Sequence, residues 1–287
     1  MSLIPEAETI TDDLLLKLAS TLFRSAMAAS RRLILGIAGI GGAGKSTLAA
    51  RLLAAVNDAS TRSQRTIRVA GAEGSAQAPE RLTRDVRSGA SADSSPGHPE
   101  MFPGSGRGQE KELAVLVPMD GFHFSNARLE QLNRRQRKGA PDTFDVDGYL
   151  ALLRRLREEP QSKHGNRDVS IPFPVYDRDL HEPVLRPGQH AVAAHHRIVI
   201  TEGNYLLLDE SPWSQLADLL DVCWFLDTTL EQSREWILAR HIRGGRSPQD
   251  AAAHYERCDL ANARLVHEKM RRPDRVLWWA INPESQI

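Results

Sequence analysis

The chain has little cysteine and no excess of charge of either sign. Among its 287 residues there are two cysteines, Cys223 and Cys258. They cannot form a disulfide framework, so a reducing compartment fits best. Lys plus Arg and Asp plus Glu each total 37. A general polyanion binder needs a surplus of Lys and Arg, so we expect no nucleic-acid partner.

Long apolar runs are also missing. No run approaches eighteen consecutive apolar residues, so we expect no membrane span and no membrane partner. The first stretch, MSLIPEAETITDD, is acidic and does not resemble a signal peptide or a mitochondrial presequence. These features predict a cytoplasmic protein. The hydrophobic content of 41% and the charged content of 26% are ordinary for a globular chain that can bury a substantial core.

Short apolar runs alternate with helical patterns along the chain. Predicted strands cover residues 33–38, 113–119, 197–201, 222–226 and 275–280, with 170–176 as a short strand or edge. Predicted helices follow a cap at Thr9 or Thr11 and continue to residue 30, then cover 45–55, 126–137, 147–157, 229–240 and 248–271. Strands that alternate with helices in one sheet imply right-handed crossovers and a three-layer α/β sandwich.

One segment, residues 71–112, breaks this pattern. Gly, Ser, Pro and Ala supply 22 of its 42 residues, so it has too little apolar surface to offset the entropy of ordering. We interpret it as a disordered insertion within a single domain spanning residues 1–287. Residues 66–70, which precede it, form either a strand or part of the same insertion.

A glycine-rich turn joins the first predicted strand to the next helix. The stretch from Gly39 to Ser46 matches G-x-x-x-x-G-K-[ST] at every fixed position, between the strand and the helix that this phosphate-binding motif requires. Glycines let backbone N–H groups surround an anion, and the helix N-terminus adds partial positive charge. The residues assigned to nucleotide binding here are Gly39, Gly41, Gly42, Ala43, Gly44, Lys45, Ser46 and Thr47. Lys45 can reach the β- and γ-phosphates, and Ser46 can offer its hydroxyl to Mg²⁺.

Other nucleotide-binding classes lack their signatures. A GTPase would need N-K-x-D to bind guanine, and the chain contains no Asn-Lys pair. No signature of an ATP-binding transporter subunit follows the loop, and no His/Cys spacing matches a zinc site. The remaining candidates are small-molecule kinases and their relatives.

Two acidic residues follow predicted strands, at the edge of the sheet where ligands bind in such folds. Asp120 begins Asp-Gly-Phe-His, and Glu202 begins Glu-Gly-Asn-Tyr. A kinase needs one carboxylate near the acceptor hydroxyl and another near Mg²⁺. We assign Asp120 to the acceptor and Glu202, with Ser46, to the metal. The alternative is that each acid only caps the following helix.

These motifs together resemble the phosphoribulokinase, uridine kinase and pantothenate kinase family of P-loop kinases, especially its uncharacterised, fructose-transport-associated and fungal uridine kinase-like members. The matching stretches are 36–47, 117–123, 137–145, 174–181, 199–205 and 240–262. The phosphate loop occurs in many superfamilies. The Asp-Gly-Phe-His, Lys-Gly-Ala-Pro-Asp-Thr-Phe-Asp and Glu-Gly-Asn-Tyr stretches are far more specific.

The resemblance implies a five-stranded parallel core with a helical lid at 240–255, and it implies ATP with Mg²⁺. It supports Asp120 as the base. The other residues that it implies for the acceptor are His123, Tyr176, Asp177 and His181, and those for the triphosphate in the lid are Arg240, Arg243 and Arg246. Arg240 and Arg243 are three residues apart and therefore share a helix face. A solvated basic helix end is the alternative for these arginines.

The sequence thus predicts an ATP-dependent kinase that phosphorylates a hydroxyl of a small metabolite, such as a nucleoside, a sugar or a pantothenate-like compound. Asp120, Lys45 and Arg243 are the predicted catalytic residues. The alternative is a regulatory or assembly ATPase that has no small acceptor. The sequence is also compatible with a homodimer.

Overall fold

The computed structural model describes residues 4–72, 112–158, 170–186 and 188–280. The chain divides into two compact units, one formed by Met1–Ser60 with Glu112–Ile287 and one by Thr61–Lys111. Most of the predicted insertion, residues 73–111, lies outside the described residues. Residues 66–70 are not a strand, because helix α2 (Lys45–Ala72) continues through them.

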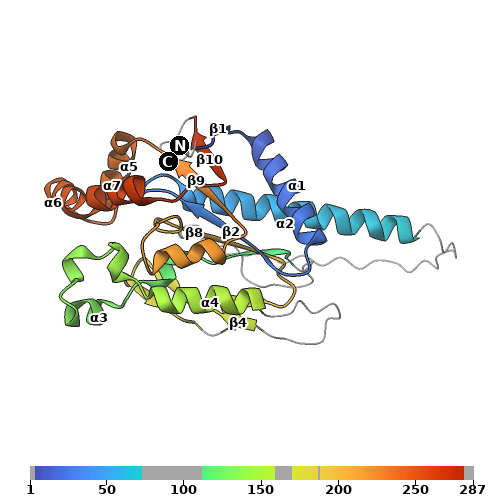
Figure 1. The fold of residues 1–287 in the computed structure, drawn as a ribbon, viewed down its shortest axis with the longest axis horizontal. Coiled ribbons are helices and arrows are strands. Elements are labelled where there is room, and N and C mark those ends of the chain that lie inside the picture. Colours follow the sequence, from blue (N-terminus) through green and yellow to red (C-terminus); the bar gives the residue numbers. More distant parts are fainter. Residues whose placement is uncertain (1–3, 73–111, 159–169, 187, 281–287) are drawn as a thin grey trace, which may run out of the picture. The chain divides into compact units, whose positions relative to one another are not determined.

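A parallel sheet of six strands forms the centre of the first unit (Figure 1), in the order β1-β10-β9-β2-β8-β3. Its strands are β1 (Ala7–Ile10), β10 (Arg275–Trp279), β9 (Val222–Asp227), β2 (Leu33–Ala38), β8 (Ile198–Gly203) and β3 (Ala114–Leu116). Five of them were predicted. The predicted strand number was wrong by one, because the short segment Ala7–Ile10 pairs with β10 in parallel.

The first strand also corrects a predicted helix cap. Thr9 lies in β1 opposite Trp278, so it cannot begin the helix. Helix α1 (Asp12–Ala28) instead starts after Thr11, whose hydroxyl accepts a hydrogen bond from the N–H of Leu14 at 3.1 Å. A threonine in this position supplies the oxygen that the first turn of a helix lacks.

Helices cover both faces of the sheet, so the three-layer α/β class is confirmed. Leu35 on β2 belongs to a buried cluster with α1 and α2, whereas its neighbour Ile34 packs into a second cluster on the other face. That second cluster includes residues of α4 (Val146–Glu158) and α7 (Leu260–Lys269). Figure 1 shows α2 and α4 on opposite sides of the strands.

The remaining predicted elements are shorter or divided. Predicted helix 126–137 is α3 (Asn126–Gln131) followed by a 3₁₀ turn at Arg135–Arg137. Segment 170–176 contains two short strands, each in a separate antiparallel pair. These pairs join β4 (Ser170–Pro172) to β7 (Ala191–Ala193), and β5 (Val175–Asp177) to β6 (Glu182–Val184).

Consecutive helices cover the predicted lid region, residues 240–255, and the segments on either side of it. Helix α5 (Leu230–Arg243) begins at a capping box in which Thr229 and Gln232 satisfy each other's backbone N–H groups. After a short turn, α6 (Pro248–His254) passes through a π-helical turn at Tyr255–Asp259 into α7. None of the helices among the described residues is long and apolar enough to cross a membrane.

The 3₁₀ turn Met119–Phe122, which carries Asp120, lies directly against β5. A Cβ atom added to Gly121 would be 1.9 Å from the carbonyl oxygen of Pro174. Only glycine allows the two backbones to approach this closely. Gly121 therefore fixes the distance between Asp120 and the β5–β6 pair.

Substituting Gly121 tests this contact. We expect Gly121→Ala to lower the free energy of unfolding by about 1–3 kcal/mol, because the added methyl group meets backbone rather than a flexible side chain. Gly244→Ala is the matched control, since its Cβ would meet its nearest atom at 3.4 Å, an ordinary contact. Denaturant unfolding measures both, and equal stability losses in the two variants would refute the close approach.

Candidate active site

The phosphate loop connects the end of β2 to the start of α2, as predicted. Gly42 and Gly44 have φ angles of 75° and 85°, in the left-handed region that favours glycine. Helix α5 also contacts the phosphate loop. The hydroxyl of Ser233 donates to the carbonyl oxygen of Gly41 at 2.8 Å. The helix that leads into the lid region is therefore in direct contact with the loop.

Lys45 is buried at the first position of α2, with 8% of its surface exposed. Its ammonium group donates to the carbonyl oxygen of Ile40 at 2.9 Å and to the side-chain oxygen of Asn204 at 2.7 Å. Both of these acceptors are neutral. Asn204 was not among the predicted site residues, although it lies two positions after Glu202 in the Glu-Gly-Asn-Tyr stretch.

Glu202 connects β8 to the phosphate loop. Its Oε1 accepts a hydrogen bond from the hydroxyl of Ser46 at 3.0 Å. Burial raises the pKa of Glu202, the negative charge of Asp120 raises it further, and the positive charge of Lys45 opposes the shift. The charges of Asp120 and Lys45 therefore both act on Glu202 at this edge of the sheet. Two oxygen ligands next to a phosphate loop are the donor set that suits Mg²⁺.

His123 and Tyr176, two residues predicted for the acceptor, lie close to the segment that carries Asp120. The Nδ1 of His123 is 2.8 Å from the backbone oxygen of Asp120, and its ring centroid is 4.9 Å from that of Tyr176. Burial lowers the pKa of His123. Burial raises the pKa of Tyr176, and the charge of Asp120 raises it further. The structure thus brings three of the predicted acceptor residues together.

Asp177 and His181 have other contacts at the β5–β6 turn. The Asp177 carboxylate accepts from Arg186 at 2.6 Å and from the N–H groups of Asp179 and Leu180, each at 3.0 Å. The backbone oxygen of His181 accepts from the ammonium group of Lys138 at 2.6 Å. These contacts stabilise the turn, and acceptor binding by Asp177 and His181 stays a prediction.

Lys138 begins the Lys-Gly-Ala-Pro-Asp-Thr-Phe-Asp stretch of the family resemblance but was not among the predicted site residues, and the structure places it beside Tyr176. Its Nζ is 5.0 Å from the ring centroid of Tyr176, within the range of a cation–π contact. It also donates to the side-chain oxygen of Asn126 at 2.7 Å. Burial lowers its pKa. The fold thus places the ammonium group of Lys138 beside a residue that was predicted for the acceptor.

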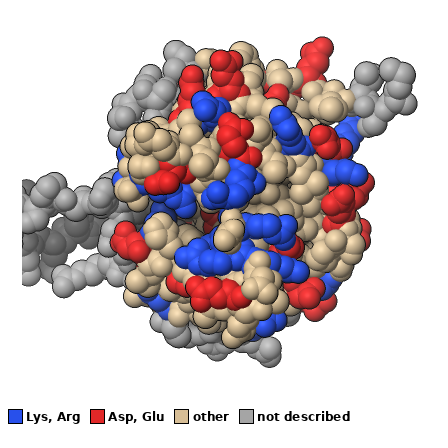
Figure 2. Space-filling view, turned by 90° about the vertical axis from the view of Figure 1, so that its left-hand side faces the viewer, with Lys and Arg blue, Asp and Glu red and all other residues tan. Residues whose placement is uncertain are grey.

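The three arginines predicted for the lid are exposed. Arg240 and Arg243 lie in the last turn of α5, and among the described residues neither has an ion pair. Arg246 follows the helix, with Nη1 at 3.0 Å from Nδ1 of His241. Figure 2 shows Lys and Arg side chains gathered across the middle of the face on which α3, α6 and α7 lie. Contact of these arginines with a triphosphate stays a prediction.

A cavity of about 310 Å³ lies at the end of β9 and the start of α5. Its lining residues are Ala7, Asp227, Thr228, Thr229, Gln232, Trp236, Trp278 and Trp279. Trp278 is 44% exposed, whereas the Nε1 of Trp279 is buried without a hydrogen-bond partner. Aromatic walls with several polar groups suit a planar ligand.

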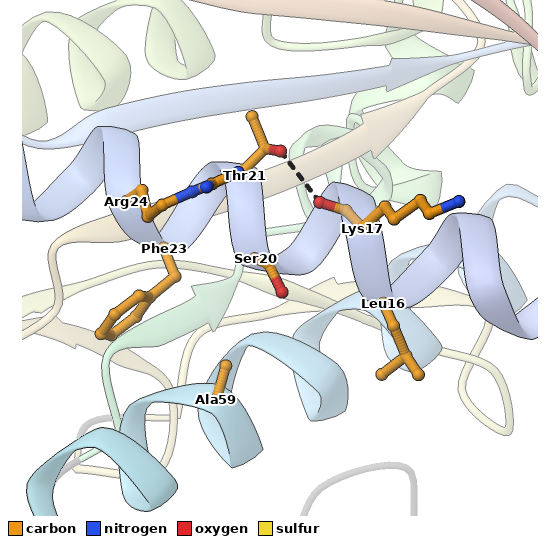
Figure 3. A pocket seen from close by; sticks show the side chains of 7 residues that line it. All are labelled: Leu16, Lys17, Ser20, Thr21, Phe23, Arg24 and Ala59. Carbon is orange, nitrogen blue, oxygen red and sulfur yellow. Dashed lines mark hydrogen bonds between the residues drawn. The ribbon is translucent and has the colours of Figure 1, made fainter.

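A second hollow, of about 490 Å³, lies between α1 and α2 (Figure 3). Its lining residues are Leu16, Lys17, Ser20, Thr21, Phe23, Arg24 and Ala59. Ala59 is fourteen residues after Lys45 in α2, which corresponds to about 21 Å along the helix axis. This hollow therefore plays no part in the site around the phosphate loop.

Sequence similarity to curated proteins shows the family to which the chain belongs. It is 34% identical over 141 residues to ATP-dependent kinase-like protein notR' of Aspergillus versicolor, covering 48% of this chain and 78% of that protein. It is 31% identical over 172 residues to a candidate uridine kinase of Schizosaccharomyces pombe, covering 58% of this chain and 69% of that protein. The chain belongs to the P-loop kinase family. The resemblance predicted from the motifs is thereby confirmed.

A solved structure of this kinase family agrees with the fold. The crystal structure of a candidate fructose transport system kinase from Silicibacter sp. TM1040 matches with a TM-score of 0.64 and 26% identity, over 92% of this chain and 98% of that chain. No family model matches the chain. The chain spans only part of the curated proteins that it matches, with 52% of the ATP-dependent kinase YFH7 of Zygosaccharomyces rouxii and 78% of the notR' protein.

Glu202 generates a prediction about stability and pH. Because its pKa is raised on folding, the folded chain keeps this proton to higher pH than the unfolded chain does. Stability is therefore lost as the pH rises from the unfolded toward the folded pKa. We expect the Tm of nucleotide-free Glu202→Gln, relative to wild type, to be higher at about pH 8 than at about pH 5.

The control for this measurement is Glu210→Gln, since Glu210 has an exposed side chain whose carboxylate lies 3.7 Å from Lys269. Its Tm relative to wild type should change little with pH, because surface ion pairs contribute little. Thermal unfolding followed by circular dichroism measures both variants. If the relative Tm of Glu202→Gln instead falls as the pH rises, burial does not dominate the environment of Glu202.

Proposed function

We propose that this chain is an ATP-dependent kinase that transfers the γ-phosphoryl group to a hydroxyl of a small metabolite. The observation that carries the proposal is the meeting of three groups at one edge of the sheet. Lys45 lies at the phosphate loop, Glu202 is hydrogen-bonded to Ser46, and Asp120 is close enough to raise the pKa of Glu202. This edge therefore offers one group for the phosphoryl donor, one for a divalent cation and one for an acceptor hydroxyl.

The nucleotide end of this arrangement uses the loop and the aromatic cavity. The N–H groups of the phosphate loop and the Lys45 ammonium group bind the phosphates, and the hydrogen bond from Lys45 to Asn204 orients the ammonium group. The cavity lined by Trp278 and Thr229 accepts the adenine. Ser46 and Glu202 would hold Mg²⁺, which supplies charge neutralisation at the phosphates when it is bound.

The acceptor end uses Asp120. Its carboxylate accepts the proton of the acceptor hydroxyl as that oxygen attacks the γ-phosphorus, and the bond to the β-phosphate oxygen breaks. His123 and Tyr176 line the same place with partly buried rings. Arg243 and its lid neighbours stabilise charge on the phosphoryl group when the lid closes, and closure excludes water.

The class of acceptor follows from the acceptor side and from the relatives. Aromatic rings beside a carboxylate and the Lys138 ammonium group suit a polyhydroxylated compound with one flat or polar face. The names of the relatives refer to uridine and to fructose transport. We therefore propose a sugar or a nucleoside as the acceptor.

Substituting Asp120 tests the proposed transfer. We expect Asp120→Asn to lower acceptor phosphorylation by about 10²–10⁴-fold, because the amide cannot take the hydroxyl proton. Affinity for a fluorescent ADP analogue should stay unchanged, since Asp120 is assigned to the acceptor. ADP release is measured with pooled sugars, nucleosides, vitamins and their phosphates.

The matched control is Asp218→Asn, since Asp218 is an exposed acid at the end of the 3₁₀ turn Trp213–Asp218. It should turn over acceptors like wild type. Normal turnover by Asp120→Asn would remove the base assignment. ADP release that is the same with and without every pool would favour the regulatory or assembly ATPase instead.

A further inference from the structure

Three potential metal ligands meet in the lid region, on side chains that the proposed function does not use. His241 comes from the last turn of α5, His254 is the last residue of α6, and Asp259 ends the π-helical turn. One ligand atom from each lies within 4.8 Å of the other two. Helices α5 and α6 and the π-helical turn are thus brought together by these three side chains.

The geometry of this cluster is close to that of a metal site. Oδ2 of Asp259 is 3.2 Å from Nε2 of His241 and 3.9 Å from Nε2 of His254. The centroids of the two imidazole rings are 4.9 Å apart, and the ring planes are nearly perpendicular, at 86°. Ligand atoms bound tetrahedrally to Zn²⁺ at its usual bond lengths are about 3.4 Å apart. The separations of Asp259 from the two histidines, 3.2 and 3.9 Å, lie on either side of that value.

The π-helical turn places the carboxylate between the two histidines. Residues Tyr255–Asp259 widen the helix by one residue, and Asp259 ends that turn. Such turns cost helix stability and are frequent at functional sites. The three side chains are also only partly exposed, at 16% for His241, 18% for His254 and 20% for Asp259. A bound ion would therefore be held by protein on one side and reach solvent on the other.

We propose that His241, His254 and Asp259 bind a divalent transition-metal ion, with Zn²⁺ as the best match, at the base of the lid. Two imidazole nitrogens and one carboxylate oxygen form a donor set that suits zinc and its neighbours, whereas Mg²⁺ prefers oxygen ligands. The site is separate from the Ser46–Glu202 pair. Water or a ligand completes the coordination.

Arg246 links this site to the rest of the lid. Its Nη1 is 3.0 Å from Nδ1 of His241. A guanidinium group only donates, so the contact uses the lone pair of Nδ1 and leaves the proton of a neutral ring on Nε2. Metal binding at Nε2 moves that proton to Nδ1 and releases Arg246. If Arg246 meets the triphosphate, as the proposed function holds, metal binding frees it for that contact.

Zinc binding to the whole chain tests the site. Titration of the nucleotide-free protein with Zn²⁺ against a chromophoric chelator should give one site, and Mg²⁺ should not compete. We expect His241→Gln, His254→Gln and Asp259→Asn each to weaken Zn²⁺ binding by more than about tenfold, since each loses a ligand rather than an outer partner. Arg246→Gln should tighten it, because a cation 3.5 Å from Nε2 is removed.

His267→Gln serves as the control, because His267 is an exposed histidine on α7 outside the cluster. It should bind Zn²⁺ like wild type. Circular dichroism without metal identifies any variant that fails to fold. Visible absorption of the Co²⁺ form gives a second measurement, since its bands report tetrahedral nitrogen and oxygen ligands. Equal Zn²⁺ affinity in wild type and in folded His254→Gln, or no binding by wild type, would overturn the site. Neither result bears on the assignment of Asp120 as the base, which is tested by Asp120→Asn.

Discussion

The hydrogen bond between Ser46 and Glu202 connects the two halves of the candidate active site. It joins the first turn of α2 to the end of β8 at 3.0 Å. The bond is possible because strands β2 and β8 are adjacent and parallel, so both strands end at the same edge of the sheet. β3 pairs with the other side of β8, and its continuation carries Asp120 to that edge as well. Parallel pairing thus determines which side chains can meet.

This arrangement has a cost in stability. Glu202 is 7% exposed, and burial raises the pKa of its carboxyl group. An ionised carboxylate in such a place destabilises the folded chain unless cations accompany it. Lys45 offsets part of that cost, and a bound divalent cation would offset more. The site is therefore prepared for positive charge before any ligand arrives, which is the form of preorganisation that favours phosphoryl transfer.

The sequence predicted the parts of the site that depend on local chemistry. The glycine-rich loop has a fixed spacing and lies between an apolar run and a helix, so Lys45 and Ser46 could be assigned. Asp120 and Glu202 could be assigned because each follows a buried strand. β1 was missed because Ala7–Ile10 is too short and too polar to have a periodic pattern, and its pairing with β10 joins segments that are far apart in the chain.

The other omissions also depend on tertiary contacts. Asn204 contacts Lys45 across 159 positions of sequence, and no local pattern predicts that contact. Lys138 begins a stretch that carries the family resemblance, but nothing in that stretch predicts its contact with Tyr176, which depends on the fold. The lid cluster needs a π-helical turn to bring Asp259 to His241. A sequence without the usual spacing of zinc ligands does not predict a site made by three separate elements.

Detection of the transferred phosphoryl group shows whether the chain phosphorylates a small molecule. Wild-type protein is incubated with Mg²⁺, ATP labelled in its γ-phosphoryl group and a metabolite extract, and the small molecules are then analysed by mass spectrometry. Phosphoryl transfer by this chain predicts label in at least one hydroxyl compound of the extract, with formation of that product dependent on the protein. Label found only in inorganic phosphate, released at the same rate with and without the extract, would contradict it.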